Sequence, residues 1–217
     1  MSEPFEYELI DFGDARRLER IGPWLLDRPC PTATGARRAQ SDAWRAATAR
    51  YQGPRAGEGK WSPVPANWKP PTLELAARLS ESAHIRLQLE PLPSGQIGMF
   101  PEQFANWQWI ARQTAAHRQT GGVGECNEPL RVLNLFGYTG GSTLAAAAAG
   151  AQVVHVDAAQ SVVQRARKNA AASELAEAPI RWIVEDALKF CQREVRRGKR
   201  YDAIILDPPS YGHGPKG

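Results

Sequence analysis

A chain of 217 residues is long enough for one large domain or two small ones. Hydrophobic residues make up 42% and charged residues 23%, a balance typical of a globular protein with a buried core and not of a disordered chain. No apolar run approaches the ~20 residues that span a bilayer, and the N-terminus lacks the basic and then apolar pattern of a signal peptide. We therefore expect a cytoplasmic protein that does not enter a membrane.

The cysteines and histidines give no sign of a metal site. Cys30, Cys126 and Cys191 are far apart in the sequence and form no CxxC pair. A scattered, odd set argues against both a disulfide framework and a zinc site. The four histidines do not have the spacing of metal ligands either, so the sequence predicts no bound metal.

The first 100 residues combine turn residues with short strand patterns. Residues 7–12 form a strand-like piece, and Ile85, Leu87 and Leu89 alternate with polar residues as in a half-buried strand. A turn rich in Pro and Gly follows, and then a second strand-like piece at 96–100. These patterns predict a small, mostly β domain over residues 1–100.

Positive charge is concentrated in the same region. The chain has a formal net charge of +4, and residues 15–69 contain eleven Lys and Arg against four Asp and Glu. Such an excess favours a polyanionic partner such as RNA, although a solvated basic face that only keeps the protein soluble has the same pattern. Four tryptophans in this region are compatible with stacking on bases or with a small aromatic core: Trp24, Trp44, Trp61 and Trp68.

From Pro101 the pattern changes to helical periodicity, followed by alternating strands and helices. Phe104, Trp107, Ile110 and Ala111 are spaced to form one apolar stripe on a helix that starts near Pro101. Strands are then expected at 130–136, 152–156, 180–184 and 201–206, and helices at 142–149, 159–172 and 188–197. Alternation of this kind builds a parallel sheet that helices cover on both faces, so residues 101–217 are predicted to form an α/β domain.

The first of these strands runs into a glycine-rich turn, Asn134 to Gly141. Glycines let a ligand approach the backbone closely, and the N-terminus of the following helix offers unpaired N–H groups. The turn lacks the G-x-G-x-x-G spacing, which argues against a nicotinamide dinucleotide. By itself the turn is a weak signal.

Acidic residues follow the second and third strands. Asp157 lies 20 residues beyond Gly137, the offset at which an acid accepts hydrogen bonds from a ribose diol. Asp186 and Ala187 lie where a carboxylate and a small side chain would line an adenine. Either aspartate could instead do no more than cap the helix that follows it.

The sharpest signal is the segment Asp207-Pro208-Pro209-Ser210-Tyr211, directly after the fourth strand. Two prolines fix the backbone, so Asp207 and nearby carbonyls would point rigidly into a pocket with an aromatic side chain behind them. Acceptors beside an aromatic ring suit a flat base that carries hydrogen-bond donors. The alternative is a proline-rich turn that closes the strand.

These four segments resemble motifs I to IV of the class I S-adenosylmethionine-dependent methyltransferases. More narrowly, NLFGYTGG together with DPPS resembles bacterial enzymes that methylate bases of large-subunit ribosomal RNA. The resemblance covers residues 101–217, with shorter similarities at 18–22, 27–29 and 98–103. The general motif I has an acid where Asn134 stands and glycines where Phe136 and Tyr138 stand.

The resemblance implies a Rossmann-like fold, the cofactor S-adenosylmethionine and RNA, in particular ribosomal RNA, as the partner. The family's sheet continues through three more strands after motif IV, so we expect the chain to be a truncated form with the first four strands. A ring-carbon target would require a cysteine nucleophile, which could lie in the absent part. Two alternatives stay open: an RNA-binding fragment that no longer turns over, and a methyltransferase for small molecules.

The resemblance also assigns residues to the site. Asp207, Pro208 and Tyr211 would hold the target base. The residues implied in cofactor binding are Asn134, Phe136, Gly137, Tyr138, Thr139, Gly140, Asp157, Ala158, Asn169, Asp186 and Ala187.

Overall fold

The computed structural model describes residues 6–53, 59–65, 68, 74–120 and 128–209. The chain forms two compact units, which we describe separately. The first consists of Met1–Ala77 and Leu87–Phe104, and the second consists of Arg78–Arg86 and Ala105–Gly217.

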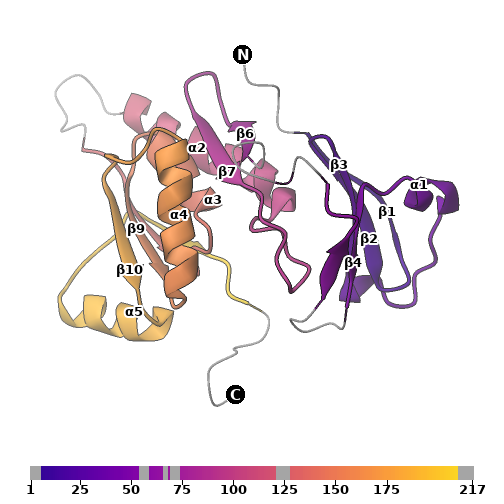
Figure 1. The fold of residues 1–217 in the computed structure, drawn as a ribbon. Coiled ribbons are helices and arrows are strands. Elements are labelled where there is room, and N and C mark those ends of the chain that lie inside the picture. Colours follow the sequence, from indigo (N-terminus) through magenta and orange to yellow (C-terminus); the bar gives the residue numbers. More distant parts are fainter. Residues whose placement is uncertain (1–5, 54–58, 66–67, 69–73, 121–127, 210–217) are drawn as a thin grey trace. The chain divides into compact units, whose positions relative to one another are not determined.

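The first unit contains a five-stranded sheet in the order of the chain, β1-β2-β3-β4-β5 (Figure 1). Neighbouring strands are antiparallel except β3 and β4, which are parallel. A short 3-10 helix, η1 (Pro31–Ala33), and the helix α1 (Ser41–Arg45) connect these two. The strands span Tyr7–Gly13, Arg16–Ile21, Trp24–Pro29, Ala49–Gln52 and Lys60–Ser62. The mostly β N-terminal region and its strand at 7–12 are confirmed.

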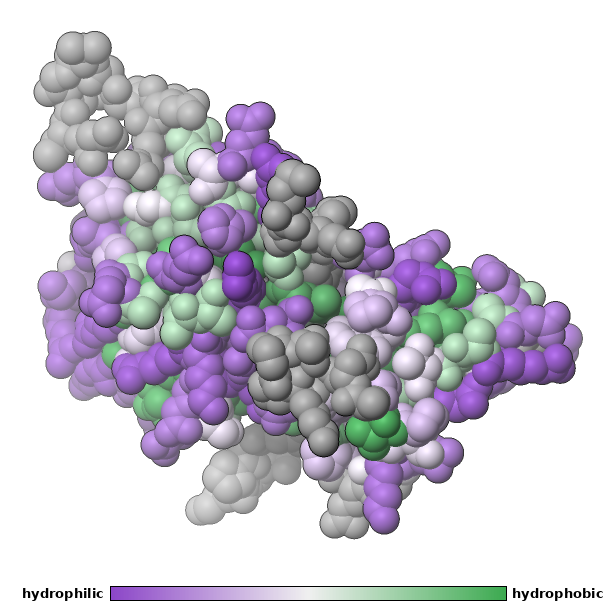
Figure 2. Space-filling view, turned by 45° about the horizontal axis from the view of Figure 1, so that its top comes forward, coloured by the Kyte–Doolittle hydropathy of each residue, from purple (hydrophilic) through white to green (hydrophobic). Residues whose placement is uncertain are grey.

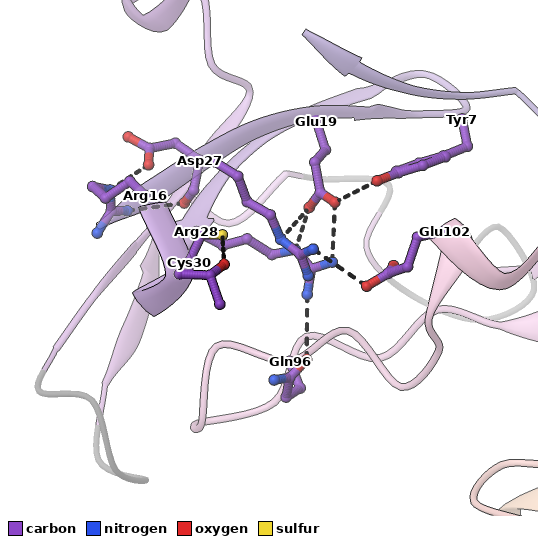
Figure 3. A network of polar contacts seen from close by, with 10 residues as sticks. Tyr7, Arg16, Glu19, Asp27, Arg28, Cys30, Gln96 and Glu102 are labelled. Atoms are coloured by element: carbon purple, nitrogen blue, oxygen red, sulfur yellow. Dashed lines mark hydrogen bonds and ion pairs between the residues drawn. The ribbon is translucent and has the colours of Figure 1, made fainter. Parts of the chain in front are cut away.

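Ionised side chains lie inside this unit, beside strands β2 and β3 (Figure 3). Glu19 is fully buried. The guanidinium of Arg28, a residue that is 1% exposed, donates to both carboxylate oxygens of Glu19. The hydroxyl of Tyr7 also donates to Glu19 Oε1, at 3.0 Å, and Arg17 Nε lies 3.2 Å from Oε2. Arg28 has a further acceptor in Gln96, 3.3 Å away. Every group of this cluster therefore has an opposite charge or a hydrogen-bond partner.

A second cluster surrounds Asp27, which is also buried. Arg16 forms an ion pair with Asp27 Oδ1 and donates to the carbonyl of Tyr51 at 2.9 Å. Arg50 Nε lies 3.4 Å from the other carboxylate oxygen. Several arginines of the basic stretch are thus partners of internal carboxylates, so its charge excess is not all at the surface.

The four tryptophans of the basic region are buried, with exposed fractions between 2% and 9%. Trp68 packs edge to face against both Trp24 and Trp61, with ring centroids 6.4 Å and 5.3 Å apart. This geometry is typical of aromatic side chains in a core. Of the two interpretations, stacking on bases and a small core, the structure favours the core.

Strands β6 (Glu74–Arg78) and β7 (His84–Gln88) form a separate two-stranded sheet, with Ile85 and Leu87 buried as their alternation predicted. The strand expected at 96–100 is wrong. That segment is irregular and bends at 98–99, where Gly98 has φ of +80°, which is incompatible with an extended chain. The amide of Leu92 donates to the carbonyl of Gln96 at 2.8 Å instead.

The second unit is built on a four-stranded parallel sheet in the order β10-β9-β8-β11 (Figure 1). Renumbered from its own first strand this order is 3-2-1-4, the arrangement of a Rossmann-like sheet. The strands span Arg131–Leu135 (β8), Gln152–Asp157 (β9), Ile180–Val184 (β10) and Ala203–Leu206 (β11). The helices span Phe104–Thr120 (α2), Gly141–Ala148 (α3), Gln160–Ala172 (α4) and Ala187–Arg196 (α5), and the 3-10 helix η2 (Pro101–Gln103) precedes α2. The predicted α/β class and the alternation of elements are confirmed.

Helices pack on both faces of this sheet. Val132 and Val153 on one face contact Ala146 of α3, whereas Leu133 on the other face belongs to the cluster of Phe190 from α5. In sheets of this kind, ligands bind at the loops that follow the carboxyl ends of the strands. On β11, the outer strand, the α5 face is open and leaves Ile204 and Leu206 exposed.

No described helix is both long and apolar enough to cross a membrane. The face in Figure 2 carries mainly hydrophilic residues, with smaller hydrophobic areas between them.

Candidate cofactor site

Four chain segments leave the parallel sheet at the same edge. Strand β8 ends at Leu135 and leads into the turn at 136–140, β9 ends with Asp157, and β10 ends just before Glu185 and Asp186. Strand β11 ends at Leu206, so Asp207 follows at this edge as well. The parallel register of the strands therefore brings the four predicted motifs to one side of the sheet.

The turn after β8 has an unusual backbone. Phe136 and Tyr138 have φ of +56° and +47°, and Gly140 has φ of +95°. Side chains other than glycine rarely adopt this conformation, at a cost of about 1–3 kcal/mol each. The glycines of the general motif I thus correspond to positions where the backbone favours glycine. At Phe136, packing of the ring against the core beneath α5 offsets part of this cost.

Gly137 and Gly140 are required for a different reason, which is space. A Cβ atom at Gly137 would lie 2.4 Å from Cε1 of His155, well inside van der Waals contact. At Gly140 it would lie 3.2 Å from the Cβ of Ala166 on α4. The turn therefore lies directly on β9 and α4, with Gly137 and Gly140 buried and Phe136 and Tyr138 half-buried.

Asp157 connects this turn to the start of α4. Its Oδ2 accepts a hydrogen bond from the amide of Tyr138 at 2.9 Å, and its Oδ1 accepts one from Ala159 at 3.0 Å. Each carboxylate oxygen has a second lone pair, and the side chain is partly exposed. The group can therefore hold the loop and still accept hydrogen bonds from ribose hydroxyls. Ala158 is exposed beside it.

Asp186 has the capping role that the sequence left open. Its Oδ1 accepts a hydrogen bond from the amide of Lys189 at 3.0 Å and caps the N-terminus of α5. The side chain is exposed, so its other oxygen faces away from the helix cap and is open to a ligand. Ala187 lies in the first turn and is buried. Capping and ligand binding are compatible here.

Two predicted cofactor residues lie beneath the turn instead of lining its outer surface. Asn134 is buried and donates from Nδ2 to Thr143 Oγ1 at 2.8 Å. Asn169 on α4 is fully buried and donates to the carbonyl of Thr139 at 2.8 Å, while Thr139 itself is buried too. Both asparagines are placed to fix the loop from inside.

The residues expected to hold the target base are placed only in part. Asp207 and Pro208 are exposed directly after β11. Tyr211 lies outside the described residues, so its position relative to them is open.

Sequence reasoning missed two side chains at this site, Thr143 and His155. Both are fully buried, and Thr143 Oγ1 lies 2.8 Å from His155 Nδ1. Burial lowers the pKa of His155 to about 4, so its ring is neutral at physiological pH. The sequence did contain a signal for His155. Side chains of a strand alternate between the two faces of the sheet, so His155 points away from the face of Val154 and Val156, and helices were expected on both faces.

A hollow lined by polar side chains lies away from the predicted cofactor residues. A hollow of about 240 Å³ at the opposite, amino edge of the sheet is lined by Arg131, Arg181 and Tyr201 among others, and by none of the expected cofactor residues. Within the ranges described above, no three His, Cys, Asp or Glu side chains gather as a metal site.

The residues at the carboxyl edge fit an adenosine-containing cofactor. The carboxylates after β9 and β10 have acceptor positions for a ribose and an adenine amino group, and they lie beside the glycine-rich turn. A Rossmann-like sheet binds nucleosides at this edge.

Relatives of known class share this architecture. A solved structure of an S-adenosylmethionine-dependent methyltransferase from Agrobacterium tumefaciens superimposes with a TM-score of 0.76 and 36% identity, over 97% of this chain and 62% of that one. A ribosomal RNA large subunit methyltransferase I from Aeromonas salmonicida is 33% identical over 117 residues, which are 54% of this chain and 26% of the relative. Its counterpart from Salmonella arizonae is 38% identical over 85 residues, 39% of this chain and 21% of the relative.

The alignments thus span about a quarter of the curated relatives' length. The sequence model of the S-adenosylmethionine-dependent methyltransferases matches residues 83–216, more than half of the chain. The chain therefore belongs to the S-adenosylmethionine-dependent methyltransferase family.

Proposed function

We propose that the protein transfers a methyl group from S-adenosylmethionine to a base of RNA, and that the RNA is ribosomal. The substrate is suggested by the relatives from Aeromonas and Salmonella, whose names specify large-subunit ribosomal RNA. A reaction on ribosomal RNA would place the protein in the cytoplasm.

One observation carries the cofactor part of the proposal. The carboxylate of Asp157 binds the amide of Tyr138, so the glycine-rich turn and the acid after the next strand form one surface. Considered alone, the glycine-rich turn was a weak signal, and Asp157 could have been a helix cap and nothing more. Joined at the carboxyl edge of a parallel sheet, they place acceptors for ribose hydroxyls beside the glycine-rich turn.

The proposed chemistry depends mainly on positioning. The cofactor supplies an electrophilic methyl carbon on a sulfonium. The chain must hold the nucleophilic atom of the base in line with that carbon, and this orientation accounts for most of the rate enhancement. Asp207 and the carbonyl of Pro208 would accept hydrogen bonds from the base, and Tyr211 would stack on it.

We assign recognition of RNA to the β-rich region at 1–100 and catalysis to the α/β region at 101–217. Exposed arginines that pair with no buried carboxylate, such as Arg20, Arg37 and Arg45, are the part of the basic stretch available to phosphates. The internal arginines around Glu19 and Asp27 are not counted among them.

A second candidate is an RNA-binding fragment without turnover. It is favoured by the α5 face of β11, where Ile204 and Leu206 are 63% and 60% exposed. Such a chain would bind RNA and cofactor but transfer nothing.

Incubation of the purified chain with ribosomal RNA and cofactor labelled in the methyl group, followed by nucleoside analysis, distinguishes these functions. The proposal predicts label in one modified nucleoside and at least a hundredfold loss in Asp207→Ala, since positioning groups at the reacting centre contribute roughly that much. Glu177→Gln, which changes an exposed carboxylate away from the site, should behave as the unmodified chain does. Binding of RNA without transfer would support the fragment, and transfer to small acceptors but not to RNA would overturn both.

A further inference from the structure

A buried polar layer supports the proposed cofactor turn from below. In the parallel register His155 on β9 lies opposite Asn134 on β8 and opposite Trp182 on β10. Its ring packs against the indole of Trp182, with centroids 4.9 Å apart and the planes tilted by 56°. Thr143 of α3 lies over the same face, and its hydroxyl contacts both Asn134 and His155 at 2.8 Å.

The order of donors in this layer favours one tautomer of the histidine. A threonine hydroxyl has one proton to donate and can accept from others. Asn134 Nδ2 has no lone pair to offer and must donate to Thr143 Oγ1. The hydroxyl proton can then go to Nδ1 of His155, 2.8 Å away. We assign the neutral ring's proton to Nε2, which is buried and has no hydrogen-bond partner among the described residues.

The imidazole of His155 also lies directly against the turn after β8. Gly137 lies so close to it that an added Cβ would be 2.4 Å from Cε1 and 2.5 Å from Nδ1. The residues on each side of Gly137, Phe136 and Tyr138, have the strained positive φ described above. A strained backbone persists where its surroundings over-determine it, and here the surroundings are the imidazole below and the amide of Gly137 bonded to the carbonyl of Val156 at 3.0 Å.

We propose that His155 is a positioning residue of the cofactor site: through Thr143 it fixes the N-terminus of α3, and through its contact with Gly137 it fixes the turn that the cofactor's methionine part would meet. This inference rests on the proposed location of the cofactor. His155 itself is fully buried, so it would act without touching the cofactor. Its role resembles that of outer-shell groups at other ligand sites, which orient the contacting groups and whose loss weakens binding by roughly tenfold or more.

The test compares Thr143→Val with Thr143→Ser. Valine keeps the shape of threonine but removes both hydrogen bonds, whereas serine keeps the hydroxyl. We expect Thr143→Val to raise the Kd for S-adenosylhomocysteine, measured by titration calorimetry, by about tenfold, and Thr143→Ser to stay within about twofold. A residue with a merely structural role would lower the melting temperature of Thr143→Val but leave the Kd of the folded protein unchanged, and that result would overturn the proposal.

A second measurement uses the unmodified chain and does not depend on the folding of any variant. Long-range ¹H–¹⁵N correlation spectra distinguish the protonated from the unprotonated ring nitrogen of a histidine. We expect His155 to be protonated at Nε2 and unprotonated at Nδ1, and a proton at Nδ1 would contradict the hydrogen-bond order on which the inference depends. A chain that fails to bind S-adenosylhomocysteine at all would refute the cofactor site itself, whereas binding that Thr143→Val leaves intact would refute the positioning role alone.

Discussion

Two carboxylates of the first unit lie within the fold, whereas two carboxylates of the second unit lie where strands end. Glu19 and Asp27 are buried, and arginines from the same sheet surround them. Asp157 and Asp186, by contrast, are half-buried and exposed, respectively, and bind backbone amides of the loops at the sheet edge. A carboxylate whose lone pairs are filled by fixed arginines has a structural role, whereas one with free acceptor positions at a sheet edge can hold a ligand.

This contrast shows that charge alone does not identify the functional residues of this sequence. The basic stretch at 15–69 and the acids that follow β9 and β10 both look functional in the sequence. Burial distinguishes the two groups of residues. A charge in a protein interior needs a fixed partner, and a carboxylate bonded to such a partner has fewer acceptor positions left for a ligand. The two units should accordingly respond differently to the removal of a carboxylate.

The largest expected effect comes from Glu19→Ala in the first unit. The substitution would leave the guanidinium of Arg28 buried without its counter-charge, and breaking a buried pair in this way typically costs about 3–5 kcal/mol of the free energy of unfolding. Urea denaturation measures the loss, and Glu81→Ala on an exposed turn is the matched control, expected within about 0.5 kcal/mol of the unmodified chain. A loss below about 1 kcal/mol for Glu19→Ala would show that the network does not hold the sheet.

Acidification should destabilise the second unit through His155. Its pKa is about 4 in the folded chain, because burial disfavours the charged ring, against 6.5 for the ordinary side chain. The folded state thus binds fewer protons than the unfolded state between these values, so stability falls as the pH drops from about 6.5 to about 4, by about 3 kcal/mol in total. The side chains around the ring, Asn134, Thr143 and Trp182, do not titrate in this range.

Because carboxylates also protonate in acid, the comparison with His155→Gln isolates the histidine. The difference in free energy of unfolding between the two proteins should shrink or change sign as the pH is lowered through this window. Parallel pH profiles for the two proteins would contradict the burial of a neutral ring.

A smaller loss is expected from Gly137→Ala, which adds a methyl group where the imidazole of His155 already lies. Overpacking of this kind costs about 1–3 kcal/mol, and displacement of the turn should weaken binding of S-adenosylhomocysteine as well. Gly198→Ala is a suitable control, since a Cβ there meets no atom within 4 Å although φ is +63°. It should lower the melting temperature slightly and leave the Kd unchanged, and equal Kd values for both variants would argue against a tight fit beneath the turn.

The sequence predicted the second unit well and the first unit poorly, for a physical reason. Strand β10 was predicted with its exact bounds and β8 to within a residue at each end, since both are short runs rich in apolar and β-branched residues between turns. Strands β2 and β3 were not predicted, because they carry Glu19, Asp27 and Arg28 at buried positions where an alternating pattern would require apolar residues. The pairing of those charges is a long-range property that local periodicity does not contain.

The same limit applied within the site. The ends of strands placed Asp157 and Asp186 at one edge without knowledge of any contact. The roles of Asn134 and Asn169 beneath the turn depend on which helix lies over them, and their partners Thr143 and Thr139 became evident from the structure alone.

The smallest expected effect separates the two roles of Asp186. Asp186→Ala removes the acceptor for the amide of Lys189 and should cost about 1 kcal/mol of stability, as loss of an N-cap does, whereas Asp186→Asn keeps a capping oxygen and should be nearly neutral. If the second carboxylate oxygen accepts a hydrogen bond from the cofactor's adenine, Asn should nevertheless weaken S-adenosylhomocysteine binding severalfold, because a charged acceptor is replaced by a neutral one. Calorimetry and thermal melting on the two variants distinguish these roles. Stability and affinity that change together would make Asp186 a helix cap alone. An asparagine variant with normal stability and reduced affinity would place this carboxylate among the ligand-binding groups of the sheet edge.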